Sequence, residues 1–299
     1  MINIKKEQNR RNMDNQWWIG DFLLITSFVL FVVPGTGQHM KRTDGAVVVH
    51  LIWHFGSLLL GENNSKRILT CHVRIQYGTR KNMSGPDTGE GTMMTITSGN
   101  PEAPIVLIQM VDDHDLDGME SEISEIRKLA ETEFYHIAVK VRNWNKDLSP
   151  WPSPAVFGRE SFGDGAADTL SEVLKYCTDR DKTYFIGGYS LAGLFALWAA
   201  YQTDVFKGVA AASPSVWFPG FVEYMRENRI RTDAVYLSLG DREEKTRNTV
   251  MAAVGVKIRE AYTLLKDQGI NTTLEWNQGN HFRDADIRTA KAYAWLMKK

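Results

Sequence analysis

From residue 93 onward, short continuous runs of apolar residues alternate with longer segments in which apolar and polar residues mix. Continuous runs, rather than strict alternation, are typical of strands buried on both faces of a parallel sheet. The mixed segments have the length and patterning of helices that cover such a sheet. The predicted strands are 105–108, 135–141, 184–187, 206–212, 234–239 and 272–276, and the predicted helices are 120–131, 166–176, 193–200, 250–266 and 284–297. This order predicts an α/β protein with a doubly wound, mostly parallel sheet.

The chain before residue 93 lacks this rhythm. A basic segment, 5–11, precedes the apolar run 17–33, an order typical of a secretion signal or a membrane anchor. The run is shorter than the roughly 20 residues that span a bilayer, and Asp21 interrupts it. Residues 68–77 alternate well enough to form a strand, and residues 78–91 have the composition of a loop.

The sequence therefore predicts an irregular N-terminal extension, residues 1–92, followed by an α/β domain, residues 93–299. All the segments that a catalytic core requires lie in the second part. An alternative interpretation is therefore that the functional protein begins at Met93 or Met94 and that the residues before it have no role. We expect a cytoplasmic protein. The alternative is a membrane-anchored one, in which only residues 17–33 contact the membrane.

Composition adds little to this picture. Hydrophobic residues make up 43% of the chain and charged residues 24%, which is ordinary for a globular protein. The net charge of −1 gives no reason to expect a nucleic-acid partner. The two cysteines, Cys71 and Cys177, form no C-x-x-C unit and suit a reducing compartment, where they serve as small apolar residues.

The segment 184–200 predicts a sharp strand–turn–helix junction. An apolar strand ends in the residues GYSLA, 188–192, and helical patterning follows directly. A turn of this kind holds a serine on strained backbone with its hydroxyl exposed. It is so tight that the residues two before and two after the serine must be small, as Gly188 and Ala192 are. Ser190 is therefore the predicted nucleophile.

Polar residues that follow two later strands supply its partners. Functional groups of a doubly wound sheet collect at the carboxyl ends of the strands. An acidic turn, 241–244, follows the strand 234–239, and His281 follows the strand 272–276. A serine hydroxyl needs a base within hydrogen-bond reach, and that base needs a carboxylate to orient it. His281 is the predicted general base.

The carboxylate of this triad has more than one candidate. Asp241, Glu243 and Glu244 all lie close enough in sequence. A position three residues beyond Gly240, which ends the strand, favours Glu243, and Asp241 is the alternative. The remaining carboxylates are expected to pair with Arg242 or Lys245, or to face water.

Two other histidines are alternatives to His281. His136 lies inside a predicted strand, so we expect it to be packed in the core. His114 stands in the cluster Asp-Asp-His-Asp, 112–115, whose oxygen and imidazole ligands suit a divalent ion. Adjacent residues do not converge easily on one ion, however, and no distant ligand is evident. We expect a solvated acidic loop that caps the next helix, and no metal.

The oxyanion hole and the substrate pocket are inferred from position. The backbone N–H of Leu191 follows the nucleophile and begins a helix, and the N–H of Val111 lies at the end of the first core strand. Trp144 and Trp151 lie in a loop that follows a strand end. Together with Trp217 they are predicted to wall an aromatic pocket for an acyl or aryl group; the alternative is that they close the edge of the core.

Four ordered motifs resemble the esterase D-like branch of the α/β hydrolases, which includes enterochelin esterases and S-formylglutathione hydrolases. The motifs are GYSLAGLFA (188–196), SPSVW (213–217), GDRE (240–243) and GNHF (279–282). The resemblance covers residues 93–299. It implies the α/β-hydrolase fold and hydrolysis of an ester or thioester through an acyl-enzyme intermediate, without a cofactor.

The chain departs from this family in two places. The position usually held by His-Gly after the first core strand is occupied by Gln109 and Met110. The N-terminal strands of many relatives are not recognisable before Met93, unless residues 68–77 supply one.

These observations predict a serine carboxylic-ester hydrolase that acts on a small-molecule ester, and they leave the oligomeric state open. One alternative is an acyltransferase with the same triad, in which another alcohol replaces water. The other alternative is a non-catalytic binding protein that kept the hydrolase fold.

Overall fold

The computed structural model describes residues 74–75 and 93–298. The predictions made for residues 17–33, for Cys71 and for most of the strand 68–77 lie outside these residues. Only Arg74–Ile75 of that predicted strand is described, as β1. Among the described residues, no helix is long and apolar enough to cross a membrane.

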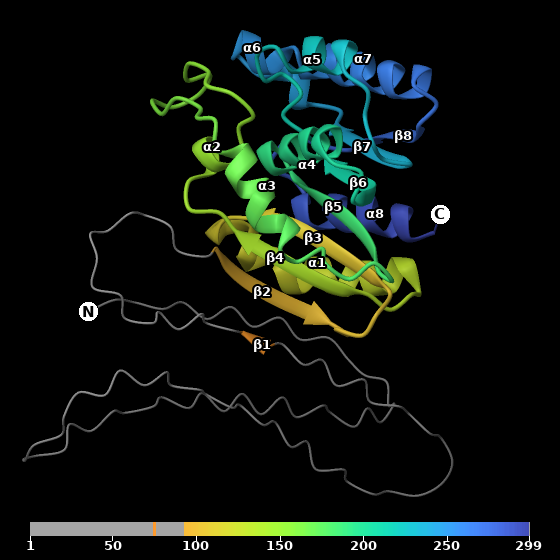
Figure 1. The fold of residues 1–299 in the computed structure, drawn as a ribbon. Coiled ribbons are helices and arrows are strands. Elements are labelled where there is room, and N and C mark those ends of the chain that lie inside the picture. Colours follow the sequence, from red (N-terminus) through yellow and green to blue (C-terminus); the bar gives the residue numbers. More distant parts are fainter. Residues whose placement is uncertain (1–73, 76–92, 299) are drawn as a thin grey trace, which may run out of the picture. The chain divides into compact units, whose positions relative to one another are not determined.

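The described strands form one mostly parallel sheet (Figure 1). Their order is β1-β2-β4-β3-β5-β6-β7-β8; β2 runs antiparallel to both of its neighbours, and every other neighbouring pair is parallel. The strands are β1 (Arg74–Ile75), β2 (Met94–Gly99), β3 (Ile105–Val111), β4 (Tyr135–Lys140), β5 (Thr183–Tyr189), β6 (Phe206–Ala212), β7 (Ala234–Gly240) and β8 (Asn271–Asn277). After β4 the chain crosses β3 and continues with β5 on its other side, so the strand order reverses at β3 and β5, where ligand sites of such sheets lie.

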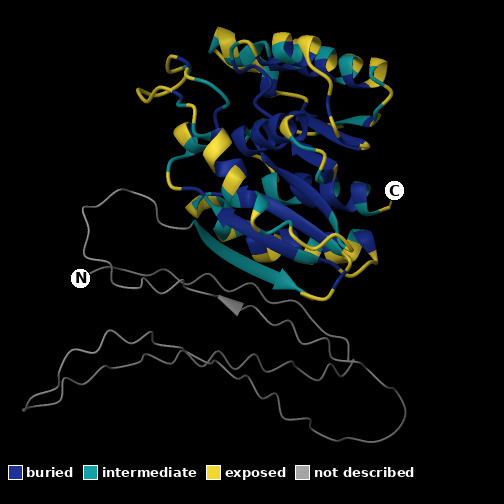
Figure 2. Ribbon diagram, viewed as in Figure 1, coloured by how far each residue is buried: buried dark blue, intermediate teal, exposed yellow. Residues whose placement is uncertain are grey.

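Helices cover both faces of the sheet. One face packs against α3, α4, α5 and α7, and the other packs against α1 and α8. The helices are α1 (Asp113–Ala130), α2 (Trp144–Asp147), α3 (Ala166–Leu174), α4 (Leu191–Gln202), α5 (Phe221–Glu227), α6 (Thr249–Ala252), α7 (Val254–Asp267) and α8 (Ala285–Met297). Figure 2 shows β3, β5, β6, β7 and α4 as mostly buried, whereas the edge strand β8 is more exposed. The doubly wound α/β class predicted from the sequence is confirmed.

Several elements differ from the sequence prediction. β2, α2 and α5 were not predicted, because their sequences contain no long apolar run. The helix expected over 120–131 begins earlier, at Asp113, because Asp112 and Asp115 form a reciprocal capping box. The helix expected over 250–266 is interrupted at Ala253, which separates α6 from α7.

A buried polar cluster joins β3, β4 and α1. The Gln109 side chain donates to Glu122 (3.3 Å), and its carbonyl oxygen lies 3.0 Å from Nε2 of His136. Burial lowers the pKa of His136 to about 3, so this histidine is a neutral core residue, as expected. Burial also raises the pKa of Glu122 well above its usual value, and the nearby carboxylates Asp115 and Asp286 add to the shift. Gln109 is thus tied to the core.

Replacing Glu122 with glutamine is expected to stabilise the protein more at pH 8 than at pH 5. The carboxyl group of Glu122 has a higher pKa in the folded chain than in the unfolded chain. Its contribution to the free energy of unfolding is therefore fully present below the usual pKa near 4.5 and is lost as the pH rises toward the raised pKa. A gain of roughly 1 kcal/mol or more at pH 8 corresponds to about one pKa unit. Urea unfolding at both pH values measures it, with the exposed Glu120→Gln on the same helix as the control. A gain that is independent of pH would contradict the assignment.

Candidate active site

Ser190 occupies the sharp turn between β5 and α4, as the sequence predicts for a nucleophile. Its backbone has φ 58° and ψ −119°, which is costly for any residue except glycine. The conformation is held because the Ser190 N–H donates to Ala212 (3.1 Å) and its carbonyl accepts from the Ser215 N–H (3.0 Å). Gly188 is required beside it, since a Cβ there would lie 2.6 Å from the Cβ of Ala192.

His281 reaches this serine from the loop after β8. Its Nε2 lies 2.9 Å from Oγ of Ser190, and its Nδ1 lies 2.7 Å from Oε2 of Glu243. A neutral imidazole with its proton on Nδ1 donates to the carboxylate and accepts from the hydroxyl. The Tyr189 hydroxyl donates to the His281 carbonyl (2.8 Å), which fixes the loop against the end of β5. We refer to Ser190, His281 and Glu243 as the relay.

Glu243 is held rigidly and out of solvent. It lies in the 3₁₀ turn η1 (Glu243–Lys245), and its side chain is only 4% exposed. The oxygen that faces away from His281 accepts three hydrogen bonds: from the Gly240 N–H (2.7 Å), the Ser213 hydroxyl (2.8 Å) and the Arg288 guanidinium (2.9 Å). These donors compensate the cost of burying the carboxylate and leave its other oxygen to the imidazole.

Arg288 on α8 contacts Glu243 and was not predicted from the sequence as part of this site. Its side chain is 1% exposed and also donates to the hydroxyls of Tyr189 (3.0 Å) and Ser213 (3.2 Å). A second nitrogen donates to the carbonyls of Gln278 (3.2 Å) and Asn280 (3.1 Å). One buried cation therefore binds Glu243 and the loop that carries His281. The available signal was a charge on the buried stripe of the last helix, where it requires a partner.

Asp241, the alternative acid, is placed differently. Its carboxylate accepts from the backbone N–H of Gly279 (2.8 Å) rather than from an imidazole. The Arg242 N–H donates to the Gly279 carbonyl (3.1 Å), so the acid loop and the histidine loop are joined by a pair of hydrogen bonds. The two loops pass so closely that a Cβ on Gly240 would lie 2.4 Å from the Gly279 carbonyl oxygen. Asp241 thus positions the histidine loop.

The two backbone groups predicted for an oxyanion hole lie at the carboxyl ends of β5 and β3. Leu191 is the first residue of α4, whose N-terminus favours negative charge. Val111 is the last residue of β3, and its carbonyl accepts from the Val141 N–H (3.1 Å). The following N–H, of Asp112, is already used by Asp115 (3.1 Å). The oxyanion role of Leu191 and Val111 stays a prediction.

A pocket of about 260 Å³ adjoins the imidazole. We call it the His281 pocket; its lining includes Trp217, Arg242, Lys245, Met251, His281 and Phe282. Trp217 is 5% exposed; its ring packs edge-on against Phe157 and at a tilt against Phe162. Of the three predicted pocket tryptophans, Trp217 is therefore the one that shares a pocket with the relay.

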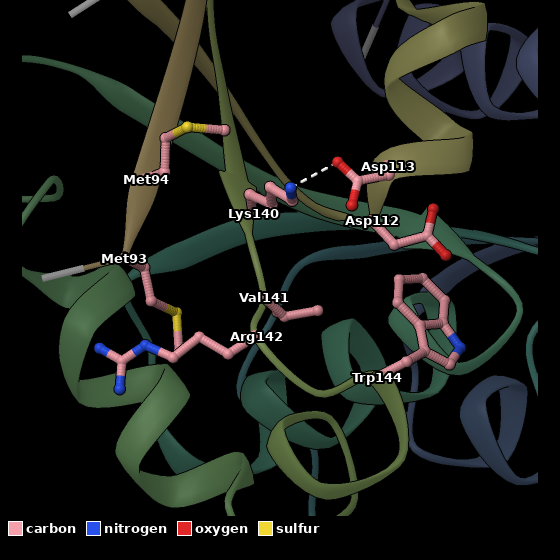
Figure 3. A pocket seen from close by; sticks show the side chains of 8 residues that line it. All are labelled: Met93, Met94, Asp112, Asp113, Lys140, Val141, Arg142 and Trp144. Atoms are coloured by element: carbon pink, nitrogen blue, oxygen red, sulfur yellow. Dashed lines mark hydrogen bonds and ion pairs between the residues drawn. The ribbon is translucent and has the colours of Figure 1, made fainter. Parts of the chain in front are cut away.

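The other two tryptophans lie elsewhere. Trp144 lines a cavity of about 490 Å³ at the carboxyl ends of β3 and β4, where Lys140 forms an ion pair with Asp113 (Figure 3). Trp151 donates to the Pro219 carbonyl (2.9 Å), and its ring packs against Phe218 and other rings near α5. Trp151 thus closes the edge of the core, as in the alternative to a substrate pocket that the sequence left open for the three tryptophans.

His114 does not contact the relay. It is exposed on the first turn of α1. Among the described residues, the hydroxyl of Ser190 is within hydrogen-bond distance of one imidazole only, that of His281. In the same part of the chain, no group of three or more His, Cys, Asp and Glu side chains is arranged to hold a metal ion.

Comparison with known proteins identifies the fold. No protein-family model matches the chain, and a search of curated proteins finds no match. Among solved structures, an IroE-like serine hydrolase from Shewanella oneidensis superposes with a TM-score of 0.57 at 14% sequence identity, over 69% of this chain and 76% of that one. The enterobactin esterase from Shigella flexneri gives a TM-score of 0.48 at 13% identity, over 69% of this chain and 56% of that one. The chain therefore spans about half the length of the second protein.

Proposed function

We propose that this chain, whose described part has the α/β-hydrolase fold, is a serine hydrolase that cleaves a carboxylic ester or thioester of a small molecule through an acyl-enzyme intermediate. The observation that carries the proposal is the relay. Its two hydrogen bonds, 2.9 Å from Ser190 to His281 and 2.7 Å from His281 to Glu243, have the geometry that activates a serine hydroxyl.

The first half of the proposed reaction transfers the acyl group to the enzyme. Oγ of Ser190 attacks the acyl carbon while its proton passes to Nε2 of His281. The Glu243 carboxylate stabilises the imidazolium that forms. The negative charge on the tetrahedral intermediate faces the N–H groups proposed for Leu191 and Val111. The bond from the acyl carbon to the leaving oxygen or sulfur then breaks, and His281 gives that atom its proton.

The second half releases the acid. Water takes the place of the leaving group, His281 removes its proton, and the resulting hydroxide attacks the acyl carbon. The bond to Oγ breaks and the proton returns to Ser190. Every proton is carried by a residue of the relay, so the reaction as proposed requires no cofactor. If another alcohol replaced water in this half, the same residues would perform acyl transfer.

Labelling with a fluorophosphonate probe tests the proposal. The folded protein is expected to form a covalent adduct at Ser190, because the probe reacts with a serine only where a base and an oxyanion hole activate it. Peptide mapping by mass spectrometry locates the adduct, and heat-unfolded protein is the control. Absence of label on Ser190 in the folded chain would favour a non-catalytic binding protein instead.

A further inference from the structure

The His281 pocket adjoins the imidazole that, in the proposed reaction, gives the leaving group its proton. In the proposed reaction, Nε2 of His281 donates its proton to the departing oxygen or sulfur, so that atom lies within hydrogen-bond reach of the imidazole. The pocket is lined by His281 itself and by Glu243 behind it. This contact with His281 makes the pocket the candidate site for the part of the substrate attached to the departing atom.

The pocket has an apolar part formed by residues from two loops and two helices. Trp217 is buried, and Met251 and Val254 contribute aliphatic surface from α6 and α7. Phe282 is 88% exposed beside His281, and the two rings meet edge to face at 5.6 Å. A large aromatic side chain left open to solvent next to a reactive group is typical of a ligand contact.

Arg242 and Lys245 supply the polar part of the lining. Both are exposed, and their backbone is fixed: the Arg242 N–H donates to the Gly279 carbonyl, and the Lys245 N–H donates to the Arg242 carbonyl, each at 3.1 Å. Their side chains therefore start from defined positions on the pocket wall.

The carboxylates of the same segment are engaged elsewhere. Glu243 binds Arg288 (2.9 Å), Glu244 binds Arg259 (3.5 Å), and Asp241 accepts from the Gly279 backbone (2.8 Å). Within the described part of the chain, Arg242 and Lys245 form no ion pair of their own. The pocket wall therefore carries two cationic side chains that have no ion-pair partner among residues 74–75 and 93–298.

We propose that the His281 pocket binds a leaving group that combines an apolar, preferably aromatic, body with a carboxylate. The apolar body packs on Trp217 and Phe282, and the carboxylate pairs with Arg242 and Lys245. The inference rests on the proposed function and names the substrate class for it: esters or thioesters of carboxylate-bearing alcohols or thiols. Because the site is partly open, the attraction is screened by salt.

A pair of matched esters tests this assignment. 3-Acetoxybenzoate and 3-acetoxybenzamide transfer the same acetyl group from leaving phenols of similar size, and each rate is divided by the rate of its hydroxide-catalysed hydrolysis. The ratio of kcat/KM for the anionic ester to that for the neutral ester is expected to be about tenfold or more at low salt, and to fall as salt is added. A ratio of one or less at low salt would overturn the inference.

Two variants assign the preference to the pocket. The double substitution Arg242→Gln with Lys245→Gln is expected to reduce the ratio about tenfold, toward one. Arg247→Gln is the matched control, because Arg247 is an exposed cation of the same segment that lies outside the pocket lining; it is expected to keep the ratio. An equal loss in both variants would mean that the general charge of the segment is responsible, and the pocket assignment would be wrong.

The same experiments separate this inference from the proposed function. Hydrolysis of both esters without preference, together with a fluorophosphonate adduct on Ser190, rejects the leaving-group assignment and keeps the serine hydrolase. Failure to hydrolyse either ester, with no adduct on Ser190, rejects both.

Discussion

Replacing Ser190 with alanine is expected to lower kcat for an activated ester such as p-nitrophenyl acetate by roughly four to six orders of magnitude. The change removes the attacking atom, and nothing else in the relay can form the acyl-enzyme. Folding is expected to survive, because the backbone hydrogen bonds that hold the turn do not involve the removed hydroxyl. Initial rates and a thermal melt on the same preparation measure both effects.

Ser215 provides the matched control for this change. Its hydroxyl lies 3.3 Å from Oγ of Ser190, but it forms no hydrogen bond with His281 among the described residues. Ser215→Ala is therefore expected to keep kcat within about tenfold of the native value, the loss typical of a lost neighbouring hydrogen bond. Turnover that persists in Ser190→Ala and disappears in Ser215→Ala would move the nucleophile to Ser215.

Replacing Glu243 with glutamine is expected to reduce kcat by about two to four orders of magnitude, whereas Asp241→Asn is expected to cost less than about tenfold. A glutamine amide donates to Nδ1 of His281, which forces the imidazole proton onto Nε2, where it cannot accept from Ser190. An asparagine at 241 can still accept from the Gly279 N–H. Steady-state kinetics of the two variants measure the contrast.

The Glu243 variant also leaves Arg288 buried without its anionic partner. Breaking such a pair costs about 3–5 kcal/mol, so unfolding could be mistaken for a loss of catalysis. The double variant Glu243→Gln with Arg288→Met removes both charges, and it is expected to recover stability without recovering kcat. Urea unfolding alongside the kinetics separates the two effects. Equal losses of kcat in Asp241→Asn and Glu243→Gln would contradict the assignment of the acid.

The elements that the sequence predicted well are those with strong local signals. The strand that becomes β5 is continuously apolar, and α4 is buried almost all round, so both are recognisable without a partner. β2 is different: its residues, MTITSG, are half-buried and include two threonines and a serine, and the strand is defined by its pairing with β4. α5 is short and lies between two predicted strands without a pattern of its own.

The relay shows the same division between local and tertiary information. Ser190 could be found because the turn demands small residues at Gly188 and Ala192, a constraint visible in the sequence. Ser213 could not: its importance comes from a left-handed backbone, φ 42°, and from a hydroxyl bonded to Glu243. Neither property leaves a mark in the local sequence. Arg288 was missed for a related reason, since its partners lie far from it along the chain.

Taken alone, the sequence determined the α/β class, the serine on its strained turn, and the order in which base and acid groups follow the strands, because each of these depends on residues close together in the chain. Position in the sequence favoured Glu243 over Asp241, but only the tertiary structure shows which of the two carboxylates contacts His281. Both follow β7 at similar distances, but η1 turns Glu243 inward to Arg288 and His281, whereas Asp241 meets the backbone of Gly279. A buried carboxylate is stable only where donors from other segments converge on it, and that convergence exists only in the folded chain.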